Sequence, residues 1–141
     1  MPGFDRIRVE VVTPYELLFN EKVDMVVLSA TDGEIGVLPG HTAMFAALKS
    51  GELRIKMGDQ WRIAVTTNGY AEIAADMVIV VVNAAEWADS INVVRAQKSL
   101  ERAEERFADP QTSAIEKTHA RHAIERAKAR LKVAEQHGGR K

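Results

Sequence analysis

The chain has 141 residues, of which 46% are hydrophobic and 28% are charged, and it contains no cysteine. This length allows one sizeable core, or one modest core with an appendage, and it excludes a large multidomain enzyme. The composition excludes a disordered chain, and the lack of cysteine excludes disulfides, thiolate metal sites, iron–sulfur clusters and cysteine nucleophiles.

The net charge of −1 conceals a difference between two parts of the chain. Residues 1–87 carry 7 Lys/Arg against 12 Asp/Glu, a net of −5, whereas residues 88–141 carry 12 against 8, a net of +4. We therefore expect two domains, 1–87 and 88–141, that face different partners. The stretch MPGFDRIRVE lacks the apolar core of a signal peptide, and no run of about 18 apolar residues occurs, so we expect a protein that stays in the compartment where it is made.

The first domain alternates between apolar and polar residues with a period of two, which predicts half-buried strands. Gly58 and Asp59 predict a short hairpin turn between two of these strands. The inward positions that the alternation predicts are Ile7, Val9 and Val11 in IRVEVV, Leu53, Ile55 and Met57 in ELRIKM, and Trp61, Ile63 and Val65 in WRIAV.

The stretch TDGEIGVLPGHTAM, residues 31–44, gathers three glycines, a proline, two carboxylates and a histidine. A catalytic site would use Asp32 and Glu34 as carboxylates and His41 as a base, but no serine, lysine or second histidine lies nearby as a partner. The glycine spacing in GEIGVLPG matches neither of the phosphate-binding motifs GxGxxG and GxxxxGK(S/T). Two turns, at Asp32 and at Pro39 with Gly40 in a type II turn, are favoured instead, with a short strand between them.

Two further segments complete the predicted sheet. Asn68 and Gly69 predict a second hairpin, because both residue types tolerate positive φ. The run MVIVVV, residues 77–82, is apolar on both faces and predicts a central strand that is covered on both sides. Many short strands joined by tight turns predict an all-β sandwich or flattened barrel.

From about Ala88 the apolar period becomes 3.6, which predicts an antiparallel α-helical hairpin with Asp89 or Ser90 as the first cap. The segment ADPQTS, residues 108–113, separates the helices, and the second helix should end at the glycines after Gln136. The predicted stripes are narrow and rich in alanine, so the hairpin should be only marginally held together. They consist of Val93, Ala96, Leu100, Ala103 and Phe107 on the first helix and of Ala120, Ile124, Ala127, Leu131 and Ala134 on the second.

Two groups of helical side chains could bind ligands. His119 and His122 share a helix face, but no carboxylate is positioned to complete a metal site, so a solvated face is favoured and no metal is predicted. Arg95, with Arg126 and Arg130 four residues apart, could clamp carboxylates or phosphates. On charge alone a solvated basic face is favoured, and the slightly acidic chain, without interleaved aromatic residues in its helices, argues against nucleic acid.

The sequence resembles the epsilon subunit of bacterial F-type ATP synthases over nearly its whole length. The segments that carry the resemblance occur in the family's order: DGEIGVLPGHTAM, GELRIK, NGYAEI, INVVRAQKSLERAEERF and ERAKARLKVAE. The resemblance implies a non-catalytic rotor subunit in the central stalk, which couples proton-driven rotation of the c-ring to ATP synthesis. It implies no required cofactor and no insertion into the membrane.

The resemblance also assigns partners. The sandwich of the family binds the gamma subunit and the c-ring, and the hairpin alternates between a folded form and an extended form that blocks ATP hydrolysis near the beta subunit. This implies a peripheral position on the cytoplasmic side of the bacterial inner membrane, and the +4 charge of the hairpin suits an acidic segment of the beta subunit. The residues that it places in a rotor contact loop are Asp32, Gly33, Glu34, Gly36, Pro39, Gly40 and His41.

Some family members bind ATP, with or without magnesium, on the folded hairpin. Here Asn92 stands where the family's motif has an aspartate, and it loses the charge that strengthens a hydrogen bond to adenine or ribose. We therefore expect weak ATP binding at most. The residues that match the family's site are Glu86, Ile91, Asn92, Arg95, Ala96, Arg126 and Arg130. The alternatives to a rotor subunit are an ATP-sensing module and a small hydrolase that uses Asp32, Glu34 and His41.

Overall fold

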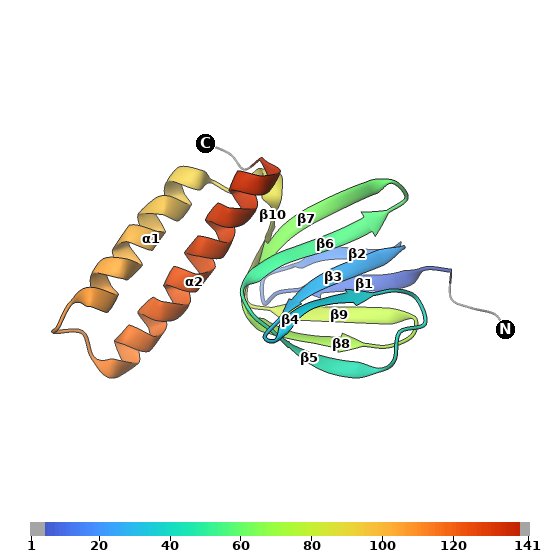
Figure 1. The fold of residues 1–141 in the computed structure, drawn as a ribbon, viewed down its shortest axis with the longest axis horizontal. Helices are drawn as coiled ribbons and strands as arrows, with labels where there is room; N and C mark the ends of the chain where they lie inside the picture. The colour runs from blue at the N-terminus through green and yellow to red at the C-terminus, as the bar shows by residue number, and fades with distance from the viewer. Residues whose placement is uncertain (1–4, 139–141) are drawn as a thin grey trace. The chain divides into compact units, whose positions relative to one another are not determined.

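A computed structural model describes residues 5–138, which form two compact units, one up to Trp87 and one from Ala88 onward (Figure 1). Within these residues, the regular elements of the first unit are all strands, and the second unit contains a short 3-10 helix and two α-helices. The predicted fold class, a β-sandwich or flattened barrel followed by a helical hairpin, is confirmed. The strands are β1 (Ile7–Val12), β2 (Leu17–Val23), β3 (Met25–Ala30), β4 (Gly33–Val37), β5 (Met44–Leu48), β6 (Gly51–Met57), β7 (Gln60–Thr66), β8 (Gly69–Ile73), β9 (Met77–Val82) and β10 (Ala85–Trp87).

One continuous sheet folds around the core of the first unit. Its strand order is β10-β7-β6-β3-β5-β8-β9-β1-β2, with β4 paired to β3 outside this path. All pairs are antiparallel except β1 with β9, which are parallel. The alternation predicted for β1 is confirmed, because Ile7, Val9 and Val11 are fully buried.

The strand β9 is central, as predicted, because it pairs with both β8 and β1. The expectation that both of its faces are covered is wrong. Val78, Val80 and Val82 enter the core, whereas Met77, Ile79 and Val81 are only half-buried. An apolar β-branched run therefore need not mean two covered faces, since such residues also favour the pleated strand itself.

The strand β7 presents the opposite face from the one predicted. The two-residue turn at Gly58, where φ is +62°, sets the register of β6 and β7 and places Ala64 opposite Leu53 and Arg62 opposite Ile55. Because Leu53 and Ile55 point into the core, Ala64 and Arg62 lie on the core face. Trp61, Ile63 and Val65 lie on the other face, where Trp61 is 45% exposed and Val65 is buried.

The predicted hairpin at Asn68 and Gly69 is also wrong. The strands β7 and β8 that flank it do not pair with each other, since β7 lies between β6 and β10 and β8 lies between β5 and β9. Gly69 does not have a positive φ. A Cβ at this position would overlap the carbonyl oxygen of Val81, so the glycine permits a close approach of β8 and β9 instead of a turn.

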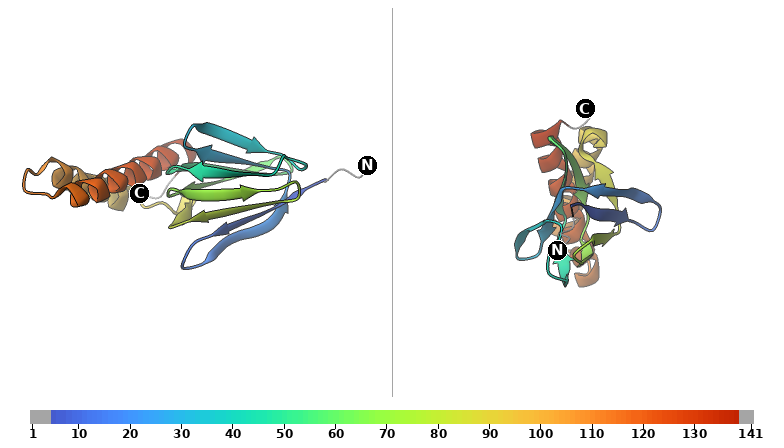
Figure 2. Two further views of the ribbon diagram at one scale, coloured as in Figure 1. Left: turned by 90° about the horizontal axis from the view of Figure 1, so that it is seen from below. Right: turned by 90° about the vertical axis from the view of Figure 1, so that its right-hand side faces the viewer.

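The second unit consists of η1 (Ala88–Ser90), α1 (Val93–Ala108) and α2 (Ala114–His137), and the two α-helices run antiparallel side by side (Figures 1 and 2). Ser113 caps α2 by accepting a hydrogen bond from the Glu116 N–H, and Gly138 ends α2 with a φ of +78°. The cap of α1 is Asn92, whose Oδ1 accepts from the Arg95 N–H at 3.0 Å. Asp89 and Ser90, which were predicted as caps, belong to η1.

The predicted stripes are confirmed mainly at their alanines. Ala96 and Ala103 on α1 are buried, and so are the alanines at 120, 127 and 134 on α2. The larger members Leu100, Ile124 and Leu131 are half-buried, and Phe107 near the end of α1 is exposed. Small buried residues let the helices approach closely but remove little apolar area from water, which agrees with a marginally held hairpin.

Candidate functional site

The predicted contact loop begins in the hairpin formed by β3 and β4. Ala30 pairs with Gly33, so Thr31 and Asp32 form the turn, and the carboxylates of Asp32 and Glu34 are exposed. Val37, at the end of β4, is fully buried and anchors the hairpin to the core. The glycine at 36 allows contact with Met25, whose Cε would lie 2.9 Å from an added Cβ. The loop therefore combines a fixed base with exposed acidic groups.

The second turn of the loop is the type II turn predicted at Pro39 and Gly40. Gly40 has a φ of +88°, and the His41 N–H donates to the Leu38 carbonyl at 3.1 Å. The Gly40 N–H also donates to the carbonyl of Ala75 at 2.7 Å, which ties this turn to the segment between β8 and β9. This part of the loop is held by backbone hydrogen bonds at two points.

The geometry gives no support to a hydrolase. The His41 Nδ1 lies 2.7 Å from the carbonyl oxygen of Thr42, and among residues 5–138 this ring contacts neither Asp32 nor Glu34. Asp32 accepts a hydrogen bond from Thr31 Oγ1 at 3.3 Å, and Glu34 pairs with Arg54. The three proposed catalytic groups are therefore engaged with different neighbours.

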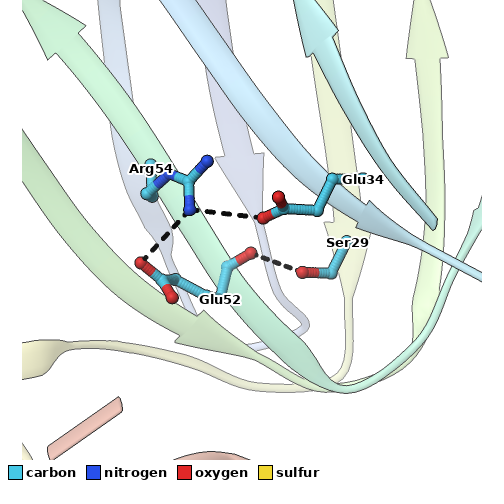
Figure 3. A network of polar contacts seen from close by, with 4 residues as sticks. All are labelled: Ser29, Glu34, Glu52 and Arg54. Atoms are coloured by element: carbon cyan, nitrogen blue, oxygen red, sulfur yellow. Dashed lines mark hydrogen bonds and ion pairs between the residues drawn. The ribbon is translucent and has the colours of Figure 1, made fainter. Parts of the chain in front are cut away.

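Arg54 links the contact loop to β6 (Figure 3). Its Nη1 lies 3.3 Å from Glu34 Oε2 and 3.9 Å from Glu52 Oε1, and Ser29 Oγ donates to the Glu52 carbonyl at 2.8 Å. Sequence reasoning did not identify Arg54 as a site residue. The available signal was its outward position in ELRIKM, but only the register of β3 against β6 and β4 brings it to Glu34.

Replacing Arg54 with glutamine should loosen this link at little cost to overall stability. Because the side chains of Arg54 and Glu34 are both partly exposed, the free energy of unfolding should fall by less than about 1 kcal/mol. Amide hydrogen exchange at Asp32 to Gly36 should nevertheless accelerate, since Glu34 loses its partner. The control is Arg6→Gln, which removes the exposed pair of Arg6 with Asp24 and should leave the loop unchanged. Equal exchange in both variants would contradict a role for Arg54 in holding the loop.

An exposed apolar patch follows the loop along the chain, on β5 and β8. Phe45 is 67% exposed, and its ring lies 5.8 Å from that of Tyr70, which is also exposed. The two residues are diagonal neighbours across the β5–β8 pair, because Phe45 pairs with Glu72 and Tyr70 pairs with Ala47. Leu38 and Met44 are exposed as well. Sequence reasoning missed this patch, which depends on a pairing between distant strands.

On the hairpin, the residues that match the family's nucleotide site fall into two groups. Ile91 and Ala96 are fully buried and support the start of α1 structurally. Arg95 is exposed, and Arg126 and Arg130 are half-buried one turn apart on α2. Because α1 and α2 are antiparallel, Arg95, thirteen residues before Ala108, lies at about the level of Arg126, twelve residues after Ala114.

Two of these arginines have no side-chain partner in the described part of the chain. Among residues 5–138, the guanidinium groups of Arg95 and Arg126 form no ion pair or side-chain hydrogen bond. Asn92 uses its side-chain oxygen as the helix cap, and Glu86 belongs to β10 in the first unit. The described residues contain no group of three potential metal ligands, His119 and His122 included, and none of the described helices has the length and apolarity to cross a membrane.

Comparisons with known proteins cover both units. Residues 6–88 match the family "ATP synthase, Delta/Epsilon chain, beta-sandwich domain", and residues 89–135 match "ATP synthase, Delta/Epsilon chain, long alpha-helix domain". An ATP synthase epsilon chain from Syntrophobacter fumaroxidans is 44% identical over 131 residues, which cover 93% of this chain and 97% of the relative. One from a Synechococcus strain is 40% identical over 129 residues, covering 90% and 96%.

A chain of the Euglena gracilis mitochondrial ATP synthase has the same fold, with a TM-score of 0.82 at 21% identity, covering 97% of this chain and 85% of that one. The two matched families and the curated relatives agree. This chain belongs to the ATP synthase delta/epsilon chain family. The resemblance to the epsilon subunit that the sequence motifs indicated is thereby confirmed.

Proposed function

We propose that this chain acts as a non-catalytic rotor subunit in the central stalk of a proton-translocating F-type ATP synthase. The observation that carries the proposal is the match of both units, in chain order, to the two domains of one family over residues 6–135. The Euglena structure with the same fold is described as an assembly of OSCP, F1 and c-ring. The subunit would be peripheral, on the cytoplasmic side of a bacterial inner membrane.

In this proposal the domain 1–87 docks on the gamma subunit and the c-ring. Two properties of its contact loop support this role. The loop is held by the buried Val37 and by the hydrogen bond from Gly40 to Ala75, so little conformational entropy is lost when a partner binds. Its exposed carboxylates and the neighbouring patch at Phe45 and Tyr70 supply polar and apolar contacts side by side.

The domain 88–141 regulates ATP hydrolysis in this proposal. Its net charge of +4, from 12 Lys/Arg against 8 Asp/Glu, favours an acidic surface such as that of the beta subunit. Its helices are capped independently by Asn92 and Ser113, so they can remain helical away from the sandwich. The shallow alanine contacts between α1 and α2 make rearrangement inexpensive.

Deletion of residues 88–141 tests this division of labour. The sandwich keeps its own core, so the truncated chain should still incorporate into the reconstituted complex in the same amount as the full chain. ATP hydrolysis by the complex should rise, and rotation-coupled synthesis should persist. Unchanged hydrolysis at full incorporation would contradict the regulatory role of the hairpin. Turnover of ATP by the isolated chain, lost in His41→Ala, would contradict the non-catalytic assignment.

A second candidate function is ATP sensing by the hairpin. The guanidinium groups of Arg95 and Arg126, which form no ion pair with any residue in 5–138, favour it. We expect weak binding by the isolated chain in calorimetric titration. Asn92→Asp should bind ATP more tightly, because an aspartate keeps the cap and adds the charge that asparagine lacks. Low-micromolar affinity in the unmodified chain that is lost in Arg126→Ala would show that the departure at Asn92 has no effect.

A further inference from the structure

In the first unit, β10 and β2 are the edge strands at the opposite ends of the sheet's strand order. Within residues 5–138 no backbone pairing joins them, yet their side chains meet. Phe19 of β2 and Trp87 of β10 are in edge-to-face contact, with ring centroids 5.9 Å apart and an interplanar angle of 75°. Aromatic side chains, instead of a hydrogen-bonded ladder, close the sandwich at this seam.

Arg62 completes the seam. Its guanidinium lies over the ring of Trp87, 3.7 Å from the centroid, and 5.9 Å from the centroid of Phe19. The register explains this position, because Trp87 pairs with Ala64, two residues from Arg62, so Arg62 and Trp87 are diagonal neighbours on one face. In the described part of the chain Arg62 forms no ion pair. Arg62 is exposed, and its guanidinium lies over the faces of these two rings.

The strand that this seam holds is short. β10, which lies beside β7 in Figure 1, contains three residues, and among residues 5–138 it pairs with β7 alone, so its backbone hydrogen bonds would hold it weakly. Its beginning is held by Thr67, whose Oγ1 accepts hydrogen bonds from the N–H groups of Asn83 and Ala84, both at 3.0 Å. Its end is held by the contacts of Trp87, which is the last residue of the first unit.

We propose that Arg62 is a positioning residue that fixes Trp87 and strand β10, so that the movable part of the chain begins at Ala88. The mobility of the hairpin is the one point at which this inference rests on the proposed function. If β10 frayed, its three residues would join the connection to the hairpin and lengthen it by about 10 Å. A longer connection lowers the effective concentration of the hairpin at any site where it docks.

The test uses the full chain with Trp61→Phe, which leaves Trp87 as the only tryptophan. Adding Arg62→Gln should increase acrylamide quenching of Trp87 and shift its emission to longer wavelength. Because Arg62 is exposed, amide exchange in β10 should accelerate by roughly two- to fivefold, while exchange in β1 and β9 stays unchanged. Arg62→Lys keeps the cation but loses the planar stack, so its β10 exchange should be intermediate.

The matched control is Lys56→Gln in the same background. In the unmodified chain the Lys56 ammonium lies 5.9 Å from the ring centre of Trp61 and not at the seam, and Trp61→Phe keeps an aromatic ring at this position. Lys56→Gln should leave Trp87 and β10 unchanged. Quenching and β10 exchange in Arg62→Gln that equal those of the parent would overturn the proposal. Increased quenching and faster β10 exchange in Lys56→Gln would overturn it too. If Arg62→Gln does not fold, Arg62→Lys decides, and parent-like β10 exchange in that variant overturns the proposal.

In the reconstituted complex, Arg62→Gln should give ATP hydrolysis between that of the full chain and that of the chain without residues 88–141. If β10 exchange is faster in Arg62→Gln but ATP hydrolysis equals that of the full chain, the proposed effect of Arg62 on the movable hairpin is overturned. If the deletion of residues 88–141 itself changes nothing, the proposed regulatory function fails. The quenching and exchange measurements on the isolated chain then still decide whether Arg62 closes the seam.

Discussion

Replacing Gly69 with alanine should lower the free energy of unfolding of the sandwich by roughly 2–4 kcal/mol. The added Cβ would overlap the Val81 carbonyl oxygen and would also lie 2.9 Å from a methyl group of Val82. Val81 lies near the end of β9 but is paired with Tyr70 of β8 and Val12 of β1, so its oxygen cannot move without disturbing both ladders. Urea unfolding followed by circular dichroism measures the loss directly.

The control for this substitution is Gly36→Ala on β4. Gly36 is also a strand glycine without a positive φ, but its added Cβ would meet only the terminal methyl of Met25, at 2.9 Å. Because the end of a methionine side chain moves easily, we expect a loss of less than about 1 kcal/mol. Equal losses in the two variants would show that alanine is simply unfavourable in these strands and that the approach of β8 to β9 is not special.

Gly69 also shows where sequence reasoning reached its limit. The dipeptide Asn68-Gly69 predicts a hairpin because this pair suits a tight turn, but a glycine serves close backbone approach equally well. The two uses cannot be told apart without knowing which strand becomes the neighbour. By contrast, the type II turn at Pro39 and Gly40 was predictable, because its geometry depends only on adjacent residues.

The face of β7 was mispredicted for a related reason. Trp61, Ile63 and Val65 form the more apolar set, yet the register set at Gly58 turns Arg62 and Ala64 toward the core. An arginine is tolerated on this face because it remains exposed at the seam, where its guanidinium stacks on Trp87. The choice of Asn92 over Asp89 as a cap is a smaller case, since a short 3-10 helix comes first.

The candidate sites were predictable as segments but not as arrangements. The contact loop was identified from its glycines and its resemblance to a family, and the structure then added Arg54, which holds Glu34 from another strand. The patch of Phe45 and Tyr70 likewise requires the pairing of β5 with β8. The pattern of a single sequence does not give the register between distant strands, because the residues around Phe45 do not indicate that Tyr70 will be its neighbour.

Replacing Val80 with aspartate should have the largest effect of any substitution considered. Val80 is fully buried in the middle of β9, and a carboxylate there would be ionised without a partner or would have to be protonated to stay buried. The expected loss exceeds about 4 kcal/mol, which is a large part of the stability of a domain of this size. We expect the sandwich to be largely unfolded at neutral pH, as measured by circular dichroism and amide exchange.

The adjacent substitution Val81→Asp tests whether β9 has one covered face or two. Val81 is half-buried on the outer face, where its neighbour across β8 is the exposed Tyr70, so a carboxylate can remain hydrated. We expect a loss of about 1 kcal/mol, mainly from the lower strand propensity of aspartate. A loss comparable to that of Val80→Asp would mean that the outer face of β9 is covered after all. A small loss would confirm that an apolar run can form a central strand of a sandwich while only alternate residues belong to its core.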